Sequence, residues 1–237
     1  MKLKQLLTAI KYRAEQVPDV DITDLVYDSR KAVPGCAFVC LRGANADGHK
    51  YAKMAAVIIA EEPVEAPVPV ILTDNTRLAL ACLSAEFFGH PAEQMHVIGI
   101  TGTKGKTTTA FMMRSILEAA GHKTGVIGTI GVLYGDTLVQ TDNTTPENYE
   151  VQKFMRQMVD AGCEYCVMEV SSQALAQGRV DGCHFDIALF TNLTQDHLDY
   201  HLTMENYLKA KEELFSRVME TDGTAVLNAD IPEFAEL

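Results

Sequence analysis

The segment from Gly102 to Thr109 has the composition of a phosphate-binding loop. It reads Gly-Thr-Lys-Gly-Lys-Thr-Thr-Thr, follows the apolar stretch 97–100 and precedes an amphipathic stretch that starts at residue 110. Two glycines let the backbone turn tightly enough to direct several N–H groups at one anion, and a helix start adds a positive dipole. Lys106 adds a full charge, and the hydroxyl of Thr107 could reach a magnesium ion. The segment predicts a nucleoside triphosphate site.

The loop is shorter than the standard phosphate-binding pattern. That pattern has a glycine five positions before the glycine of Gly-Lys-Thr, and Ile100 occupies the position here. An ordinary turn between a strand and a helix could also contain Gly-x-x-Gly-Lys-Thr, but the flanking apolar and amphipathic stretches favour the phosphate site. The predicted nucleotide-binding residues are Gly102, Thr103, Lys104, Gly105, Lys106, Thr107 and Thr108.

Glu169 lies inside the apolar run 165–170, next to its carboxyl end. A buried carboxylate requires a cation or a hydrogen-bond network to offset its desolvation. Beside a phosphate site the natural cation is Mg²⁺, which keeps water and phosphate oxygens as ligands and therefore needs few protein ligands. The alternative is that Glu169 only caps a loop.

Residues 196–201 read Asp-His-Leu-Asp-Tyr-His, with two His and two Asp in six positions. These residue types are compatible with zinc, but no further ligand is identifiable by spacing, so a role with magnesium or substrate beside the phosphates is favoured. A solvated polar turn stays open as the alternative. Lys209, further along, is predicted to lie on a solvated helix face.

The order of the elements predicts an α/β fold with two domains. Strand candidates 37–41 and 68–72 and a helix over 77–88 form a small α/β unit, and Gly89-His90-Pro91 then interrupts the pattern. We therefore expect an N-terminal domain over residues 1–90 and a central domain over 91–237.

In the central domain, apolar runs alternate with amphipathic stretches. Continuous apolar runs suit strands covered on both faces, so a mostly parallel, doubly wound sheet is expected, with ligands at the carboxyl ends of its strands. Phe111, Ile116, Leu117 and Ala120 are assigned to the inner face of the helix that follows the loop. The predicted strands are 97–101, 124–128, 165–170, 186–191 and 224–228, and the predicted helices are 106–120, 147–161 and 203–219.

Composition excludes several classes of protein. Hydrophobic residues make up 47% of the 237 residues, enough to bury a core in each domain, and no stretch approaches the ~18 apolar residues of a membrane span. The net charge of −12 argues against duplex nucleic acid as a partner. The six cysteines lack a second close pair for a zinc site, so they are interpreted as buried free thiols in a cytoplasmic protein.

Five segments, taken in order, resemble the Mur ligases. They cover most of the chain, and their order is more specific than any one of them: Tyr27-Asp28-Ser29-Arg30, Gly102–Thr108, Asn143-Thr144-Thr145-Pro146, Glu169-Val170-Ser171-Ser172 and Thr191–His201. Within that family they look most like the members that add the third residue, diaminopimelate or lysine, to UDP-N-acetylmuramoyl-L-alanyl-D-glutamate in peptidoglycan biosynthesis.

The resemblance implies ATP-dependent amide ligation. The acceptor carboxylate is phosphorylated to an acyl phosphate, and the amine of the incoming amino acid then displaces phosphate. Because a free carboxylate is a poor electrophile and phosphate is a good leaving group, the protein has mainly to align two anions and neutralise them. The implied cofactors are ATP, Mg²⁺ and a carbamylated lysine, and the implied oligomeric state is a monomer.

The resemblance also assigns roles to residues. The catalytic residues are Lys106, His197 and Lys211. The metal ligands are Thr107, Glu169, His197 and, as a carbamate, Lys211. The muramoyl-dipeptide would contact Asn143, Thr144, Thr145, Ser171, Gln177 and Arg179, and the uridine diphosphate end would contact Tyr27, Ser29, Ala44, Asn45 and Ala46. Carbamylation has a chemical rationale, because carbon dioxide adds only to a neutral amine and the product is a carboxylate that can bind a second Mg²⁺.

Members of the family extend beyond the position that matches Leu237, into a domain that binds the incoming amino acid. The resemblance therefore implies that this chain corresponds to an N-terminal half and is not a competent ligase alone. Two alternatives stay open: a nucleotide-binding fragment or regulator without ligase activity, or another Mur ligase, such as the enzyme that adds D-alanyl-D-alanine. The identity of the third amino acid is open as well.

Overall fold

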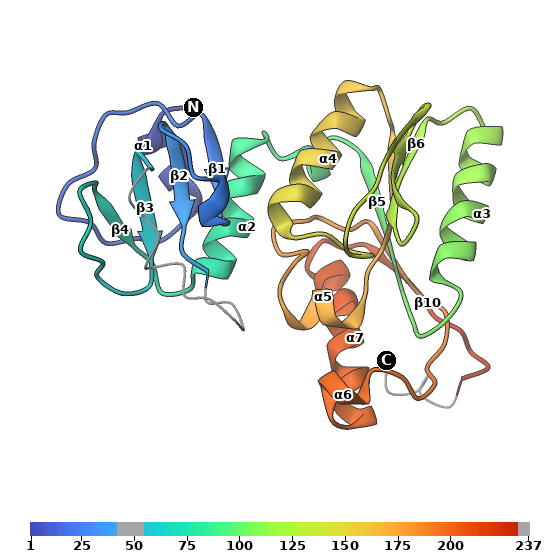
Figure 1. The fold of residues 1–237 in the computed structure, drawn as a ribbon. Coiled ribbons are helices and arrows are strands. Elements are labelled where there is room, and N and C mark those ends of the chain that lie inside the picture. Colours follow the sequence, from blue (N-terminus) through green and yellow to red (C-terminus); the bar gives the residue numbers. More distant parts are fainter. Residues whose placement is uncertain (42–54, 232–237) are drawn as a thin grey trace. The chain divides into compact units, whose positions relative to one another are not determined.

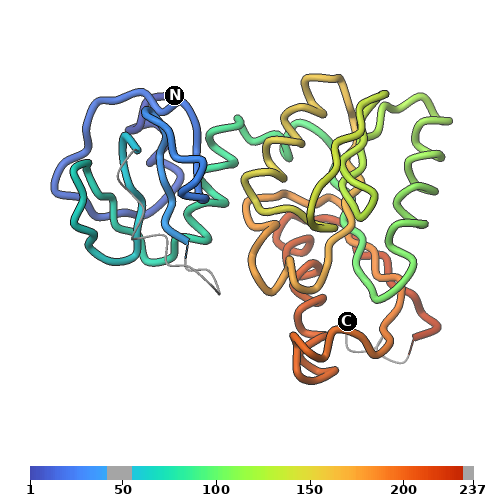
Figure 2. Tube along the Cα trace, in the orientation of Figure 1, coloured from blue at the N-terminus to red at the C-terminus, as the bar shows by residue number. Residues whose placement is uncertain are grey.

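The structure is a computed structural model that describes residues 1–41 and 55–231. The chain divides into two compact units, Met1–Gly89 and His90–Leu237. Figure 1 shows their helices and strands, and Figure 2 traces the same path of the chain. Each unit has its own sheet, so each is described by itself.

The first unit is a four-stranded parallel sheet in the order β1-β2-β3-β4. Phe38 and Ile58 on its central strands are fully buried, and α2 packs on β1 and β2. The side chain of Asn75 caps α2 by accepting hydrogen bonds from the amides of Arg77 and Leu78. The elements are α1 Leu3–Leu6, η1 Leu7–Ala9, β1 Asp24–Val26, η2 Ser29–Lys31, β2 Cys36–Val39, β3 Val57–Ala60, β4 Val70–Leu72 and α2 Thr76–Phe87.

The second unit contains a seven-stranded sheet in the order β11-β10-β5-β9-β6-β7-β8. The first five strands are parallel, whereas β7 and β8 add an antiparallel hairpin at one edge. The strands are β5 His96–Thr101, β6 Thr124–Gly128, β7 Gly131–Tyr134, β8 Thr137–Val139, β9 Tyr165–Glu169, β10 Ile187–Phe190 and β11 Thr224–Val226. The helices are η4 Pro91–Glu93, α3 Lys106–Ala119, α4 Asn148–Asp160, α5 Ser172–Ala176, α6 Leu198–His201 and α7 Met204–Glu220.

Both faces of this sheet are covered, which explains its continuous apolar strands. Helix α3 lies on one face, and α4, α5 and α7 lie on the other (Figure 1). Successive residues of β9 alternate between the two cores: Val167 packs with Ala110 of α3, whereas Cys166 and Met168 pack in the larger cluster that contains Met155 of α4. The predicted mostly parallel, doubly wound sheet is confirmed.

Two predictions about local structure require correction. The hairpin β7–β8 was not anticipated, although Gly135-Asp136 forms its two-residue turn. The assignment of Ile116 and Ala120 to the core is wrong, since both are exposed and Ile116 is 66% exposed. The inner face of α3 instead follows Ala110, Met113 and Leu117, at intervals of three and four residues, because this spacing keeps side chains on one side of a helix. Phe111 also packs partly against this core.

Two smaller predictions concern Lys209 and the cysteines. Lys209 is exposed and pairs with Glu205 one turn earlier on α7, as a solvated helix face predicts. All six cysteines are free thiols as predicted, but Cys82 and Cys183 are half-buried rather than buried. Among residues 1–41 and 55–231, no helix is long and apolar enough to cross a membrane.

A candidate phosphate-binding cleft

A cleft of about 810 Å³ opens at the carboxyl ends of β5, β6 and β9. It brings together the phosphate loop and residues that follow other strands, as expected for a parallel sheet. Residues 103–108 form one side, and the rest of the lining is Thr129, Asp142, Asn143, Thr144, Glu169, Ser171, Gln173, Gln177, Arg179, His197 and Tyr200. Most of the residues to which the sequence assigns roles in this unit therefore share one cavity.

The segment after β10 holds the phosphate loop in place. The amide of Thr103 donates to the carbonyl of Asn192 (2.9 Å), and the amide of Lys104 donates to Oδ1 of the same residue (2.9 Å). The hydroxyl of Thr191 and the side-chain amide of Asn192 both donate to the carbonyl of Lys104. The loop is thus fixed before any ligand arrives, which lowers the entropic cost of binding.

Gly102 is required by two features of this contact. Its φ of +135° lies where L side chains are rarely found, and a Cβ there would lie 2.0 Å from the hydroxyl of Thr191. Any larger residue would separate the loop from the segment that supports it. The shortened glycine spacing noted in the sequence therefore corresponds to a loop that packs directly on its neighbour.

The amino terminus of α3 has the features of an anion site. Gly105 precedes the helix with φ of +86°, and no side chain caps the first turn. Nζ of Lys106 turns back to the carbonyls of Gly102 (2.8 Å) and Thr103 (3.1 Å), and its burial lowers the pKa of its ammonium group. Uncapped helical amides and a poorly hydrated lysine are well suited to phosphate oxygens.

Glu169 is 1% exposed and has a complete set of hydrogen-bond donors. Its carboxylate accepts from the hydroxyl of Thr107 (2.8 Å), the amide of Thr129 (3.0 Å) and the hydroxyl of Thr129 (3.2 Å). A Cβ on Gly128 would lie 2.1 Å from Oε1 of Glu169, so this glycine makes room for the carboxylate. The buried charge predicted from the sequence is compensated by these bonds.

The donor set fits a hard cation of the magnesium type. The oxygens of Thr107 and Glu169 are 2.8 Å apart, close to the separation of neighbouring ligands around Mg²⁺. In the described ranges, no three His, Cys, Asp or Glu side chains are close enough together to hold a metal ion. An ion here would therefore have at most two ligands of these residue types, with phosphate and water completing its shell, and a zinc site at residues 196–201 is not supported.

His197 and Lys104 lie at the rim of the cleft. His197 has φ of +52° and a half-exposed ring, and its amide donates to Oδ1 of Asp196. Nζ of Lys104 pairs with Oδ2 of the same aspartate at 3.2 Å, and this hydrogen bond lowers the pKa of Asp196. Both side chains line the cleft and are free of the tight packing around Glu169.

Lys211 is a buried cation behind the phosphate loop. It is 1% exposed, its Nζ donates to the carbonyl of Gly102 at 3.2 Å, and the ring of Tyr207 lies 4.4 Å from the same atom. Desolvation, with the nearby ammonium of Lys106 as a second cause, lowers the pKa of Lys211 to about 7. Much of this side chain is consequently a neutral amine at neutral pH.

The wall opposite the phosphate loop is a network of polar side chains. The guanidinium of Arg179 bonds the carbonyl of Thr145 (3.1 Å) and pairs with Glu147 (3.0 Å), and its Nη2 donates to Oε1 of Gln177 (2.8 Å). Gln177 in turn donates to the hydroxyl of Tyr200 at 3.2 Å. Arg179 and Gln177 both line the cavity, and their side chains carry N–H groups of the kind that bind acidic ligands.

Helix α4 positions this wall through two buried amides that the sequence did not reveal. Asn148 donates to the carbonyl of Gly178 (3.0 Å), and Gln152, one turn later, donates to that of Gly182 (3.0 Å). Gly178 and Gly182 lie on either side of Arg179 in the sequence, so these two hydrogen bonds fix the turn that carries Arg179. Polar residues spaced by four in an apolar helix face are the signal that could have identified them.

Other contributing residues were also missed. Thr129 holds the carboxylate of Glu169, Asn192 holds the phosphate loop, and the hydroxyl of Tyr207 donates to Oγ1 of Thr103 at 3.1 Å. A threonine after a strand or an asparagine in a turn has no distinctive spacing. Tyr207 is different, since it lies four residues before Lys211 and so on the same helix face.

The residues predicted to meet a uridine diphosphate belong to the first unit. Tyr27 is half-buried after β1, and Ser29 begins η2. Between them, Asp28 accepts three hydrogen bonds from the guanidinium of Arg30, which lower the pKa of Asp28 to about 2. Ala44, Asn45 and Ala46 lie outside the described residues, so the structure says nothing about that prediction.

The sheet, the uncapped helix after the glycine loop and the buried carboxylate define an α/β protein of the phosphate-loop class. Residues 100–237 match the Mur ligase middle domain. Because that match covers more than half of the sequence, and close relatives align over nearly all of it, the chain belongs to the Mur ligase family.

Curated relatives include UDP-N-acetylmuramoyl-L-alanyl-D-glutamate--2,6-diaminopimelate ligases. The Bacillus licheniformis enzyme is 50% identical over 99% of this chain and 51% of its own length, and the Clostridium perfringens enzyme is 44% identical over 100% and 50%. A solved structure of a ligase with the same description has a TM-score of 0.81 at 24% identity, covering 100% of this chain and 49% of that one, which shows the shared fold. MurF from Acinetobacter baumannii gives 0.70 at 25% identity, over 98% and 49%. The chain spans about half the length of the curated relatives it matches.

Proposed function

We propose that this chain forms the acceptor-binding and ATP-binding part of a ligase that adds 2,6-diaminopimelate to UDP-N-acetylmuramoyl-L-alanyl-D-glutamate. The observation that carries the proposal is one cleft lined both by the phosphate loop and by Arg179 and Gln177. The diaminopimelate specificity rests on the names of the relatives at 43–50% identity. The proposed location, the cytoplasm, follows from the nucleotide substrates.

In this proposal ATP phosphates lie on the amino terminus of α3. Lys106 exchanges its bonds with the carbonyls of Gly102 and Thr103 for bonds with the transferring phosphate. Thr107 and Glu169 hold Mg²⁺, which neutralises phosphate charge when bound, and His197 is the proposed further ligand. Lys104 can leave Asp196 and approach the phosphates from the rim.

The acceptor carboxylate is proposed to lie between the two sides of the cleft. Arg179 and Gln177, with the loop residues Asn143 to Thr145 and with Ser171, hold the muramoyl-dipeptide so that its carboxylate faces the γ-phosphate. Alignment of two anions is the main requirement, because phosphorylation of the carboxylate creates the acyl phosphate that an amine then attacks. In the first unit, Tyr27 and Ser29 are the proposed contacts of the uridine diphosphate.

Lys211 is the proposed carbamate. Its buried, largely neutral amine meets the chemical requirement for addition of carbon dioxide: the nitrogen lone pair attacks the carbon, a proton leaves, and an anionic carbamate remains. That anion would lie beside Lys106, because Nζ of Lys106 and Nζ of Lys211 both lie within 3.2 Å of the carbonyl oxygen of Gly102. The carbamate would then supply a carboxylate oxygen to a second Mg²⁺.

Ligation is tested in a chimaera in which this chain replaces the matching half of the Bacillus licheniformis relative. We expect phosphate release that depends on diaminopimelate and on the muramoyl-dipeptide nucleotide. Nucleotide binding with no release under these conditions would favour a binding module or regulator. Release with D-alanyl-D-alanine in place of diaminopimelate would favour the other branch of the family.

The carbamate has its own test in the same chimaera. Lys211→Ala is expected to abolish phosphate release, and millimolar formate or acetate is expected to restore part of it by placing a carboxylate in the vacated space. Lys209→Ala, on the exposed face of the same helix, is the matched control. Failure of every short carboxylic acid to restore activity, with nucleotide binding intact, would count against the carbamate.

A further inference from the structure

Two buried side chains, His201 and Ser172, share a hydrogen bond to which the proposed reaction assigns no role. Nε2 of His201 lies 2.9 Å from Oγ of Ser172, and the residues are 6% and 2% exposed. His201 ends α6, and Ser172 begins α5. Neither residue lines the cleft, yet each is next to one that does, Tyr200 and Ser171 respectively.

From Ser172 the contacts lead to the buried Glu169 and to the part of the cleft formed by Thr145, Gln177 and Arg179, here called the acceptor wall. The amide of Ser171 donates to Oγ1 of Thr145 (3.1 Å), and the same hydroxyl donates to the carbonyl of Glu169 (2.8 Å). The hydroxyl of Ser171 also caps α5, by accepting from the amide of Ala174. A displacement of Ser172 would therefore move the loop that follows β9.

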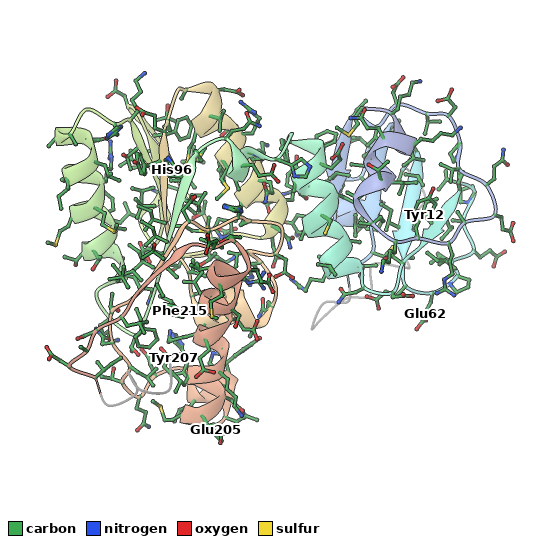
Figure 3. All side chains as sticks on the ribbon, turned by 180° about the vertical axis from the view of Figure 1, so that it is seen from behind. Tyr12, Glu62, His96, Glu205, Tyr207 and Phe215 are labelled. Carbon is green, nitrogen blue, oxygen red and sulfur yellow. The ribbon has the colours of Figure 1, made fainter. Side chains whose placement is uncertain are left out.

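From His201 the contacts lead to the lysine behind the phosphate loop. Its ring packs against that of Tyr207, with centroids 5.2 Å apart, and its carbonyl accepts from the side chain of Asn206 (3.0 Å). Tyr207 lies under Nζ of Lys211 and donates to Thr103. Figure 3 shows Tyr207 projecting from α7.

The backbone around His201 indicates why a fixed contact is needed there. Helix α6 has only four residues and is flanked by two non-glycine residues with positive φ, His197 at +52° and Leu202 at +69°. Such conformations persist only where the surroundings determine them. Leu202 is itself largely exposed, so the buried side chain of His201 is the group that anchors α6.

We propose that the His201–Ser172 hydrogen bond is a positioning link that couples the acceptor wall to the phosphate loop. It rests on the proposed function, since the two ligands are those named above. With the link intact, a ligand that orders one side of the cleft pre-orders the other, so each ligand strengthens binding of the other by the same factor. His201 and Ser172 are positioning residues and touch neither ligand.

The test measures this coupling in the 237-residue chain by calorimetry. UDP-N-acetylmuramoyl-L-alanyl-D-glutamate is titrated with and without saturating Mg²⁺ and a non-hydrolysable ATP analogue. We expect the analogue to tighten acceptor binding about tenfold in the wild type. His201→Asn and Ser172→Ala should reduce this factor to below about twofold, while each affinity measured alone changes less than threefold.

His201→Gln provides the rescue that a merely structural role would not show. A glutamine amide can occupy the position of Nε2, whereas an asparagine amide is too short, so Gln should keep most of the coupling and Asn should lose it. His122→Asn, an exposed histidine paired with Glu164 before β6, is the matched control and should keep the full factor. The double variant His201→Asn with Ser172→Ala should be no worse than either alone.

The outcomes separate the link from the proposed function. Wild-type chain that binds neither ligand would refute the proposed function and the link together. Binding of both ligands without coupling in the wild type, or coupling that persists in His201→Asn and Ser172→Ala, would overturn the link alone. Equal loss in His201→Gln and His201→Asn, with a matching fall in melting temperature, would assign the pair a structural role and also overturn it.

Discussion

The two ends of the seven-stranded sheet carry the same kinds of residue in different surroundings. At the amino end, His96 and His184 lie 3.7 and 3.8 Å from Oδ1 of Asp186, and all three side chains are a third or more exposed. At the carboxyl end, Glu169, His201 and Lys211 are almost completely buried. In Figure 3, His96 and Tyr207 mark these two ends.

The difference shows that residue type alone does not define a site. The polar groups at the amino end lie near one another in water, where such pairs contribute little. At the carboxyl end, the phosphate loop and the strand termini bury side chains of the same types. Because this burial removes water from them, the pKa values of Lys106, Lys211 and His201 are lowered. Substitutions should therefore have large effects at one end and small ones at the other.

Lys106→Met should give the largest effect. Loss of a charge-assisted bond to phosphate from a desolvated site should weaken binding of an ATP analogue on the order of 100-fold. Calorimetric titration measures this directly, and Lys209→Met on the exposed face of α7 serves as the control. Unchanged affinity in Lys106→Met would mean that phosphate does not bind at α3.

Lys211→Met tests the burial of charge through the pH dependence of stability. The folded pKa of Lys211 is about 7 and the reference value is 10.5, so between these values the unfolded chain holds a proton that the folded chain lacks. Stability of the wild type therefore rises with pH across this window. Below pH 7 the cost of the buried charge is complete, and Lys211→Met should be more stable than wild type by on the order of 2 kcal/mol.

That advantage of Lys211→Met should shrink as the pH rises from 7 towards 10.5. Urea unfolding in carbonate-free buffer at pH 6, 8 and 10 measures it without carbamate formation. A difference between the two chains that stays constant over this range would show that Lys211 is not desolvated as the structure indicates.

Glu169→Gln should have an intermediate effect that appears only with magnesium. The amide keeps the shape of the side chain but cannot act as an anionic ligand, so the gain in nucleotide affinity from Mg²⁺ should fall on the order of tenfold. Affinity without Mg²⁺ should change little. Glu164→Gln, at the amino end of the sheet, is the matched control, and an equal response in both variants would argue against a metal role for Glu169.

The sequence predicted the site at the carboxyl end of the seven-stranded sheet, and the physical reasons can be identified. The glycine loop between an apolar run and an amphipathic stretch located the phosphate site, and parallel topology then required the polar residues after other strands to lie nearby. Burial of Lys211 was not predicted, although its position four residues after Tyr207 and three before Leu214 on α7 is compatible with the apolar face of that helix.

What the sequence did not predict depends on tertiary contacts. Thr129, Asn148 and Gln152 act through hydrogen bonds to partners 30 or more residues away, and such partners leave no local spacing. Ile116 was assigned to the core because it is apolar and helical, whereas only the packing of α3 shows which apolar stripe faces the sheet. The same limit applied to the His201–Ser172 pair, 29 residues apart.

The smallest effect is expected at the amino end. His96→Asn and His184→Asn remove exposed groups whose pairs with Asp186 are long, so the free energy of unfolding should change by less than about 0.5 kcal/mol. Nucleotide affinity should be unaffected. A loss of nucleotide or acceptor binding in either variant would show that the amino end of the sheet also contains a functional group. That result would contradict the difference proposed between the two ends.

Hydrogen–deuterium exchange with mass spectrometry distinguishes the two ends of the seven-stranded sheet, because it reports on both in one experiment. With Mg²⁺ and an ATP analogue, amides of residues 102–109 should exchange more slowly, and addition of UDP-N-acetylmuramoyl-L-alanyl-D-glutamate should extend this protection to 143–145 and 171–179. Amides of residues 90–96 and 181–186 should be unchanged. Protection confined to the amino end, or no protection in the phosphate loop at saturating nucleotide, would contradict a ligand site at the carboxyl ends of the strands.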